Sequence, residues 1–217
     1  MDKWIVKYMK LAKTLADDNN ACYSRHIGVV IISDDNTPIG FGYNGSIAGA
    51  PHTDTDVYLA HLWDNLLSEN QRKYLRDKYQ IADARKSQFY AHVNYSMTSS
   101  RQAKCFADKF KDCKTCPRKL LDLPSGEGLE LCNCSHAERN AIFNASKRGT
   151  STKNATMYCW CGCPCHECSI AIIQSGIKKV VCLKTGNPDY SKSSRFNFQM
   201  TGVDLVEVEE KDILQDT

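Results

Sequence analysis

Four side chains in two short segments have the types and spacing that zinc hydrolysis needs. His136 and Glu138 are separated by one alanine, and Cys165 and Cys168 follow as Pro-Cys-x-x-Cys. One imidazole and two thiolates are a ligand set that leaves the fourth tetrahedral position of zinc open to water. Zinc lowers the pKa of such a water toward neutrality. Glu138, two positions from His136, is expected to lie beside the metal as general acid and base rather than bind it.

Both ligand segments are expected to open helices, over residues 136–147 and 165–175, with a strand over 155–160 between them. A helix N-terminus stabilises the thiolate form of cysteine that zinc requires. A closed structural zinc site using the same ligands is the alternative, and Cys163 is the nearby residue that could close it. His166 is expected to lie outside the ligand set.

The pattern His-x-Glu with a later Pro-Cys-x-x-Cys is the signature of zinc nucleobase deaminases. The rest of the composition limits the other classes. A net charge of +3 over 217 residues does not indicate nucleic acid binding through bulk charge. No apolar run approaches the ~20 residues that span a bilayer, and residues 1–20 have no signal-peptide character, so we expect a cytoplasmic protein without a membrane partner. Twelve cysteines in a reducing compartment favour metal ligands over disulfides.

The apolar pattern predicts an α/β protein with a mixed sheet flanked by helices. The expected order is helix, strand, strand, insert, helix, strand, helix, strand and a final strand. Outside the ligand segments, the helix is expected at 4–15 and the strands at 28–33, 39–43, 178–184 and 203–209.

The segment between the two halves is charged, aromatic and helical in character. One apolar stripe at helical spacing is expected to form its core: Leu59, Leu62, Trp63, Leu66 and Leu67. Its basic residues alternate with acidic ones, which favours a solvated face over a nucleic acid site. The basic residues are Lys104, Lys109, Lys111, Lys114, Arg118 and Lys119.

Residues 1–53 and 113–184 resemble the deoxycytidylate deaminase family, including its phage members. The resemblance lies in Cys-Tyr-Ser-Arg-His-Ile-Gly-Val-Val at 22–30, Gly-Tyr-Asn-Gly at 42–45 and His-Ala-Glu-Arg-Asn-Ala at 136–141. It implies a cytidine-deaminase-like, three-layer α/β/α fold with a five-stranded mixed sheet. It further implies one deaminase domain, 1–217, with a helical, cysteine-containing insert at about 54–131.

The resemblance also implies an activity. The family hydrolyses the cyclic amidine C–N bond of dCMP to give dUMP and ammonia, which feeds dTTP synthesis. It implies a homo-oligomer, often a hexamer, controlled by dCTP and dTTP, with Mg²⁺ accompanying a bound triphosphate. The alternatives are deamination of another free cytosine nucleotide, such as dCTP or a modified dCMP, or editing of a nucleic acid.

The nucleotide is expected to contact several residues near the two motifs. In relatives the asparagine of Gly-Tyr-Asn-Gly contacts the nucleotide, which gives Asn44 that role here; the alternative is a turn residue beside Gly45. Ser24 and Arg25 are candidates for the phosphate, since arginine makes bidentate phosphate contacts, although an exposed salt bridge would also explain Arg25. Ala137, between the ligand and the base, is assigned to the same subsite.

A second, structural zinc is expected, and two ligand sets stay open. In relatives such a zinc is bound by residues that correspond to Cys22, His52, Cys116 and Cys132. The rival is a zinc knuckle in the insert, built from Cys105, Cys113, Cys116 and either Cys132 or Cys134, in which Cys113-x-x-Cys116 has good ligand spacing. The chain departs from the family at Thr53, where members have cysteine, and at 159–165, which is one residue longer.

Overall fold

The computed structural model divides the chain into two compact units. It describes residues 2–18, 22–81, 100–124, 126–185 and 191–215. Unit 1 joins the two ends of the sequence, Met1–Gly45 and Cys134–Thr217, and unit 2 is Ser46–Asn133. Residues 82–99 of the expected insert lie outside the described residues. That a single deaminase domain carries this insert stays a prediction.

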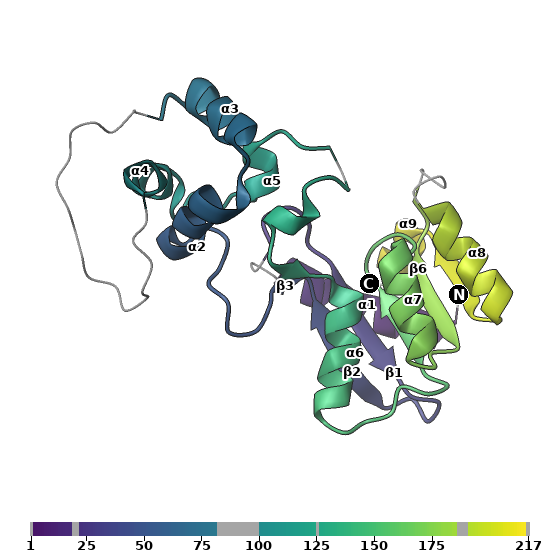
Figure 1. Cartoon of the computed structure of the whole chain (residues 1–217). Helices are drawn as coiled ribbons and strands as arrows, with labels where there is room; N and C mark the ends of the chain where they lie inside the picture. Colours follow the sequence, from purple (N-terminus) through teal and green to yellow (C-terminus); the bar gives the residue numbers. More distant parts are fainter. Residues whose placement is uncertain (1, 19–21, 82–99, 125, 186–190, 216–217) are drawn as a thin grey trace. The chain divides into compact units, whose positions relative to one another are not determined.

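Unit 1 is built on the expected five-stranded mixed sheet, in the order β2-β1-β5-β6-β7 (Figure 1). β1 pairs antiparallel with both β2 and β5, and β5, β6 and β7 run parallel. The strands are β1 (Gly28–Ile32), β2 (Pro38–Tyr43), β5 (Thr156–Cys159), β6 (Lys179–Leu183) and β7 (Asp204–Val208).

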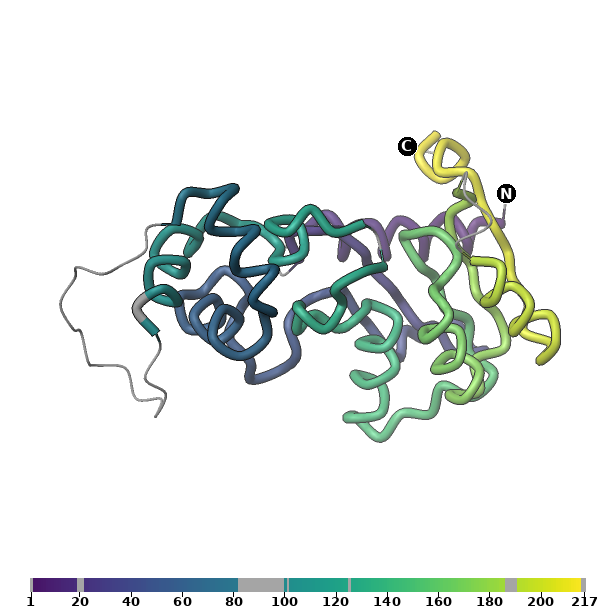
Figure 2. Tube along the Cα trace, turned by 45° about the horizontal axis from the view of Figure 1, so that its top comes forward, coloured from purple at the N-terminus to yellow at the C-terminus, as the bar shows by residue number. Residues whose placement is uncertain are grey.

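Helices cover both faces of this sheet, so the predicted three-layer α/β/α fold is confirmed (Figure 1). One layer contains α1 (Lys3–Asp17) and α9 (Glu210–Leu214), which contact each other near the two ends of the chain (Figure 2). The other contains α6 (Ala137–Lys147), α7 (His166–Gln174) and α8 (Lys192–Thr201). Successive β1 residues point to opposite layers and all are buried, which explains the unbroken apolar run Gly-Val-Val-Ile-Ile.

α8 and α9 were not predicted from the sequence. α8 has a weak apolar signal because it buries little beyond Phe198 and Ser194, while Phe196 and Met200 are 61% and 68% exposed. The topology nevertheless requires such an element. β6 and β7 are parallel neighbours, and a parallel pair needs a crossover connection, which α8 supplies.

Unit 2 is helical. Three of its helices begin at side-chain caps: the Thr55 hydroxyl accepts from the Tyr58 N–H, Ser68 forms a capping box with Gln71, and the Ser100 hydroxyl accepts from the Ala103 N–H. The elements are α2 (Asp56–His61), the π-helix η1 (Leu62–Leu66), α3 (Glu69–Tyr79), α4 (Arg101–Phe110), α5 (Pro117–Leu120) and the 3-10 helix η2 (Leu129–Leu131). The two-residue strands β3 (Gly45–Ser46) and β4 (Cys134–Ser135) mark the boundaries between the units.

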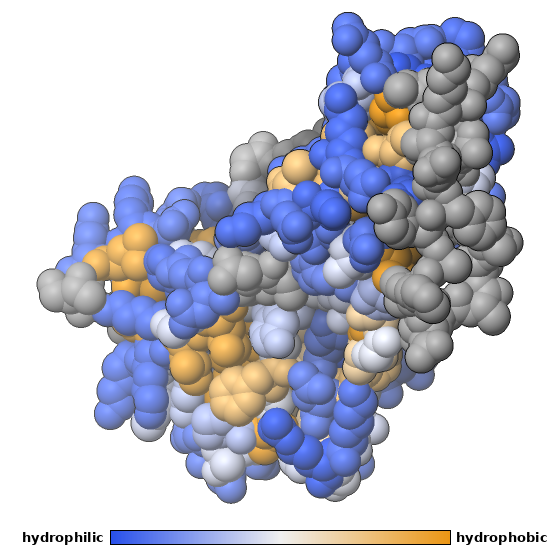
Figure 3. Space-filling view, turned by 90° about the vertical axis from the view of Figure 1, so that its left-hand side faces the viewer, coloured by the Kyte–Doolittle hydropathy of each residue, from blue (hydrophilic) through white to orange (hydrophobic). Residues whose placement is uncertain are grey.

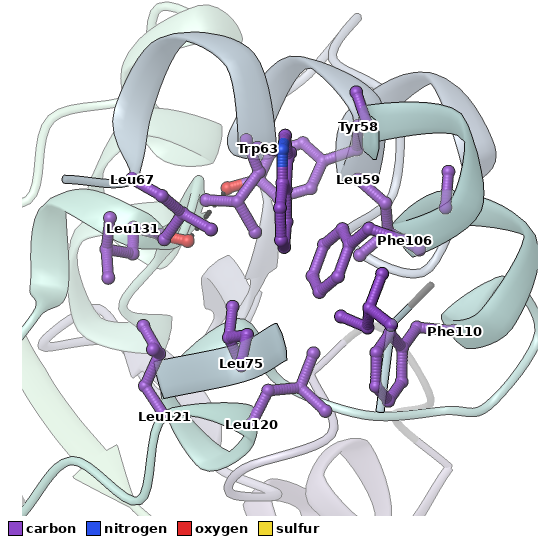
Figure 4. Packing of buried hydrophobic residues seen from close by; sticks show 14 residues of the cluster. Tyr58, Leu59, Trp63, Leu67, Leu75, Phe106, Phe110, Leu120, Leu121 and Leu131 are labelled. Carbon is purple, nitrogen blue, oxygen red and sulfur yellow. Dashed lines mark hydrogen bonds between the residues drawn. The ribbon is translucent and has the colours of Figure 1, made fainter. Parts of the chain in front are cut away.

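Aromatic rings fill the centre of unit 2 (Figure 4). The ring centroid of Phe106 lies 5.0 Å from those of Trp63 and Phe110. The hydroxyl of Tyr58 reaches from this cluster to the carbonyl of Leu131, at 3.0 Å. These contacts join α2, η1, α4 and η2 into one core.

Four of the five residues of the expected stripe are buried in this core, and the prediction was wrong for Leu66, which is 42% exposed. The cause is the π-helix. The Leu67 N–H bonds to the carbonyl of Leu62, five residues earlier, so one extra residue enters the turn. Leu67 rather than Leu66 therefore lies below Leu62.

The surface shown in Figure 3 is mainly hydrophilic, with separate hydrophobic areas. The five lysines of the basic stretch are exposed, and Lys111 pairs with Asp108 at 3.5 Å. Among the described residues, no helix is both long and apolar enough to cross a membrane.

Candidate active site

The N-termini of α6 and α7 bring the three predicted zinc ligands together. His136 is the N-cap of α6, Cys165 is the N-cap of α7, and Cys168 lies in the first turn of α7. His136 Nδ1 is 3.5 Å from Cys165 Sγ and 3.4 Å from Cys168 Sγ. The three donor atoms lie within 4.8 Å of one another. In the part of the chain that the structure describes, this is the one group of three or more such side chains gathered closely enough to hold a metal.

The electrostatics of the three side chains suit a cation. The pKa of Cys165 is lowered to about 4, first by the thiol of Cys168, which donates to it, and then by His136. The same contact, together with burial, raises the pKa of Cys168. A zinc ion at this place would bind both sulfurs as thiolates and release their protons. Nitrogen and sulfur donors in this number fit zinc.

Neither of the two nearby candidates closes the site. Cys163 is buried beside Ser191, and burial raises its pKa to about 11. His166 is exposed, and its Nδ1 is 3.5 Å from the amide nitrogen of Asn197. Both lie outside the donor group. Among the described residues, the arrangement thus has the three protein donors of a catalytic zinc site rather than the four of a structural one.

Glu138 lies in the first turn of α6, next to the donor group. Its side chain is 3% exposed, and its Oε2 is buried without a hydrogen-bond partner among the described residues. Burial raises the pKa of this carboxyl, and the imidazole of His136 opposes the rise. A buried carboxyl with one unengaged oxygen is suited to accept and return a proton.

α6 approaches the sheet closely because β2 carries glycine where the helix passes. A Cβ on Gly42 would overlap the carbonyl oxygen of Ala137, and one on Gly40 would lie 2.8 Å from that of Ala141. Ala137 itself is fully buried in the core. This packing is its observed environment, and its assignment to the substrate subsite stays a prediction.

The other predicted substrate residues lie in the segment before β1 and at the end of β2. Asn44 is buried; its side chain accepts from the Ile27 N–H at 2.9 Å and donates to the Arg25 carbonyl. Asn44 therefore fixes the chain at 25–27, and its nucleotide contact stays a prediction. Arg25 is exposed and Ser24 is half-buried. Their phosphate contacts also stay predictions.

Two residues that directly follow Glu138 were not predicted to belong to the site. The contact with Cys165 raises the pKa of both Cys168 and His136, and the guanidinium of Arg139 opposes both rises; its Nε is buried without a partner in the described chain. Asn140 bonds to β2 and to the segment before His136. Their position in the motif His-Ala-Glu-Arg-Asn could have predicted this, because one helical turn brings every residue of the motif near the metal ligands.

Within unit 2, two residues of the predicted second zinc site lie together. The thiol of Cys132 is hydrogen-bonded to Cys116 and, with burial, raises the pKa of Cys116. His52 Nδ1 is 2.7 Å from Asp54 Oδ1, and exposed Cys113 donates to the Lys109 carbonyl at 3.5 Å. Of the remaining candidates, Cys22 is buried, and Cys105 and Cys134 are half-buried. Both proposed ligand sets stay predictions.

Comparison with known proteins agrees with this geometry. The family model for the cytidine and deoxycytidylate deaminase zinc-binding region matches residues 2–184. The chain belongs to this deaminase family.

Named family members match shorter segments. The deoxycytidylate deaminase of Schizosaccharomyces pombe is 40% identical over 90 residues, which are 42% of this chain and 27% of that protein. That of Enterobacteria phage T4 is 52% identical over 50 residues, 23% of this chain and 25% of that one. The human deoxycytidylate deaminase is 43% identical over 70 residues, which are 31% of this chain and 38% of the human protein. The matches thus span well under half of these relatives.

Among solved structures, dCMP deaminase of cyanophage S-TIM5, in complex with dCMP and dUMP, is similar with a TM-score of 0.52. The match covers 96% of this chain and 99% of that one at 18% identity. At this identity the similarity shows the fold that deaminase-family chains share.

Proposed function

We propose that this chain is a zinc-dependent hydrolase that converts dCMP and water to dUMP and ammonia. The observation that carries the proposal is the group of three donors, His136, Cys165 and Cys168, beside a buried carboxyl oxygen of Glu138 that has no partner among the described residues. Three donors leave room for a solvent molecule, and the carboxyl can exchange protons with it. Membership of the deaminase family supports the same chemistry.

The chain's own residues have separate parts in this reaction. A bound zinc would supply the Lewis acidity that makes water nucleophilic at neutral pH. The Glu138 carboxylate accepts a proton from the water that attacks C4 of the cytosine and delivers it to the ring nitrogen N3. A second proton from the water passes through Glu138 to the amino group, which leaves as ammonia. The buried position of Glu138 keeps its carboxyl out of bulk solvent throughout.

The choice of dCMP rests on relatives. The S. pombe, phage T4 and human proteins are all named deoxycytidylate deaminases, and the cyanophage structure contains dCMP and dUMP. In this proposal Asn44 lies next to the nucleotide while it holds the Arg25 carbonyl, and Ser24 and Arg25 contact the phosphate. A monophosphate is the anion that one arginine fork can bind in bidentate fashion.

Ammonia release from dCMP, dCTP, CMP and cytidine tests the proposal. The zinc-loaded protein is expected to turn over dCMP with the highest kcat/KM. Faster turnover of dCTP or CMP would mean that this nucleotide, rather than dCMP, is the substrate of the same deamination reaction. Release of no ammonia from any of the four, with zinc bound, would overturn the function. A salt-dependent gel shift with single-stranded DNA or tRNA would favour the editing alternative.

Finer features of the proposal follow from family membership. We propose a cytoplasmic homo-oligomer, a hexamer in the first instance, that supplies dUMP for dTTP synthesis. dCTP would activate it and dTTP would inhibit it, each bound with Mg²⁺, and a second zinc would stabilise the fold. Sedimentation and dCMP turnover with and without each triphosphate test the assembly and its control.

A further inference from the structure

Two asparagines, one helical turn apart, attach α6 to the outer strand of the sheet. Asn140 Nδ2 donates to the Tyr43 carbonyl and Asn144 Nδ2 donates to the Phe41 carbonyl, both at 2.8 Å. Tyr43 and Phe41 are two residues apart on β2, so their carbonyls point to the same side of the strand. Among the strands of the described chain, β2 is the outermost of its sheet and has β1 as its one neighbour. The two side chains therefore take the place of a neighbouring strand.

Asn140 differs from Asn144 in one respect. Its Nδ2 also lies 3.5 Å from the carbonyl of Ser135, the residue before His136. An asparagine amide has two donor hydrogens, so one side chain can serve both carbonyls. Asn140 thus connects the end of β2 to the segment that presents the first metal donor. The side chain of Asn144 has its bond to Phe41 alone among the side-chain hydrogen bonds of the described residues.

Through these two bonds Asn140 joins the segment proposed to contact the nucleotide to the segment that holds the metal donor and the acid–base group. Tyr43 precedes Asn44, whose N–H bonds to Ile27 at 3.3 Å and whose side chain holds the segment proposed to contact the nucleotide. Ser135 precedes His136, and Glu138 lies two residues before Asn140 on the same helix.

Close packing alone does not fix this helix. The overlap that a Cβ on Gly42 would make with Ala137 shows that α6 cannot move nearer to β2. It does not prevent rotation of the helix about its axis or sliding along the strand. A directional bond at the first turn opposes both movements, because hydrogen bonds weaken steeply when they are misaligned.

We propose that Asn140 is a positioning residue for deamination, which sets the place of the Glu138 carboxyl relative to His136 and to the nucleotide by holding Tyr43 and Ser135 at once. The inference rests on the proposed function. A displacement of about 1 Å in a reacting group can reduce a rate by ~10²-fold. Loss of Asn140 is thus expected to slow the chemical step more than it weakens substrate binding.

Asn144→Ala is the matched control for Asn140→Ala. Each change removes one 2.8 Å bond from the same helix to the same strand. Both variants are expected to lower the melting temperature by similar amounts and to keep the zinc content of the wild type. Asn140→Ala is expected to lower kcat for dCMP by about 10- to 100-fold with KM changed less than threefold. Asn144→Ala is expected to keep kcat within about twofold.

Asn140→Asp serves as the second variant if Asn140→Ala fails to fold. It keeps the shape of the side chain but, when ionised, has no hydrogen to donate to Tyr43 or Ser135. The same fall in kcat is expected. Equal kcat losses in the Asn140 and Asn144 variants, a loss confined to KM, or a kcat loss that follows zinc loss would each overturn the inference. A wild-type protein that deaminates no cytosine nucleotide would overturn the proposed function instead.

Discussion

Each of the two units brings a pair of cysteines together, but in different surroundings. In unit 1, Cys165 and Cys168 face an imidazole, and the pKa of Cys165 is lowered to about 4. In unit 2, Cys116 lies against Cys132, and the neighbouring thiol and burial raise its pKa. In both pairs one thiol is hydrogen-bonded to the other. Unit 1 adds His136 and the start of α7, whose imidazole and backbone N–H lower the pKa of Cys165 further.

The interiors of the two units also differ in the polarity of the side chains that they bury. Unit 1 buries Glu138, and one of its oxygens has no hydrogen-bond partner among the described residues, an arrangement that costs stability and is retained at functional sites. The centre of unit 2 is a cluster of aromatic and aliphatic side chains around Trp63 and Phe106. Substitutions in unit 1 should therefore separate activity from stability, and those in the core of unit 2 should affect stability first.

Loss of a zinc ligand has the largest expected effect. Cys168→Ser should remove the catalytic zinc and reduce deamination below detection, because two protein donors hold the metal weakly. Cys116→Ser is the comparison in unit 2. It should keep the catalytic zinc and most of the activity, and it should lower total zinc only if a second ion is bound there. Zinc content and ammonia release are measured for both variants. An inactive but fully zinc-loaded Cys116→Ser protein would contradict the different roles of the two cysteine pairs.

Glu138→Gln should lower kcat by about 10³-fold, since positioned acid–base groups contribute roughly 10²- to 10⁴-fold. Zinc content should not change, and the melting temperature should stay the same or rise, because a neutral amide replaces a buried carboxyl.

Glu167→Gln, in the first turn of α7 and exposed, provides the control and should retain full activity. Retained activity in Glu138→Gln would remove Glu138 from the mechanism.

Trp63→Ala tests the role of the core of unit 2. Trp63 is 1% exposed, and truncation of a buried aromatic residue costs about 3–5 kcal/mol. Leu66→Ala, at the position that the π-helix exposes, should change stability by less than about 0.5 kcal/mol. Denaturant unfolding together with hydrogen exchange is the measurement. Faster exchange in α2 and α4 but not in β1 and β5 is expected, and equal effects of the two substitutions would contradict the packing described here.

The smallest expected effect concerns an ion pair of unit 1. Arg195 donates to both oxygens of Glu207, at 2.7 and 2.6 Å, and thereby lowers the pKa of Glu207. A depressed pKa stabilises the fold above the unfolded value of about 4.3, and the contribution is lost as pH falls through the folded pKa. Glu207→Gln should lower the melting temperature at pH 7 by about 2–4 °C, for ~1 kcal/mol.

The difference from wild type should begin to shrink below the unfolded pKa of about 4.3 and disappear as pH falls through the lower folded pKa, where the wild-type carboxyl is protonated as well. Exposed Glu210→Gln is the control for the loss of charge alone. A difference for Glu207→Gln that stays constant from pH 7 to pH 3 would show that the ion pair is not its cause.

The donors of the site could be predicted from the sequence because their geometry is local. His136 and Glu138 share one helix turn, and Cys165 and Cys168 share another, so residue spacing already sets their relative positions. The five strands were likewise predictable within about two residues from apolar runs and turn residues. The relative positions of residues within one helix turn or one strand can be predicted without knowing which elements pack against them.

The features that were not predicted depend on hydrogen bonds and pairings that the apolar period of a single element does not indicate. Leu66 is exposed because of a five-residue hydrogen bond in η1, which no apolar period indicates. α8 follows from the parallel pairing of β6 with β7. The bond from Asn140 to Tyr43 joins residues 97 positions apart. Such contacts are set by tertiary packing rather than by local preference.

The coordination of the bound zinc tests the central claim most directly. X-ray absorption at the zinc edge, on Cys116→Ser protein that holds one zinc per chain, counts the sulfur and the nitrogen or oxygen neighbours of the ion. Two sulfurs and two lighter atoms are expected, from Cys165, Cys168, His136 and one solvent molecule. Three or four sulfurs would mean a zinc closed by protein side chains, and the hydrolytic site described here would then be wrong.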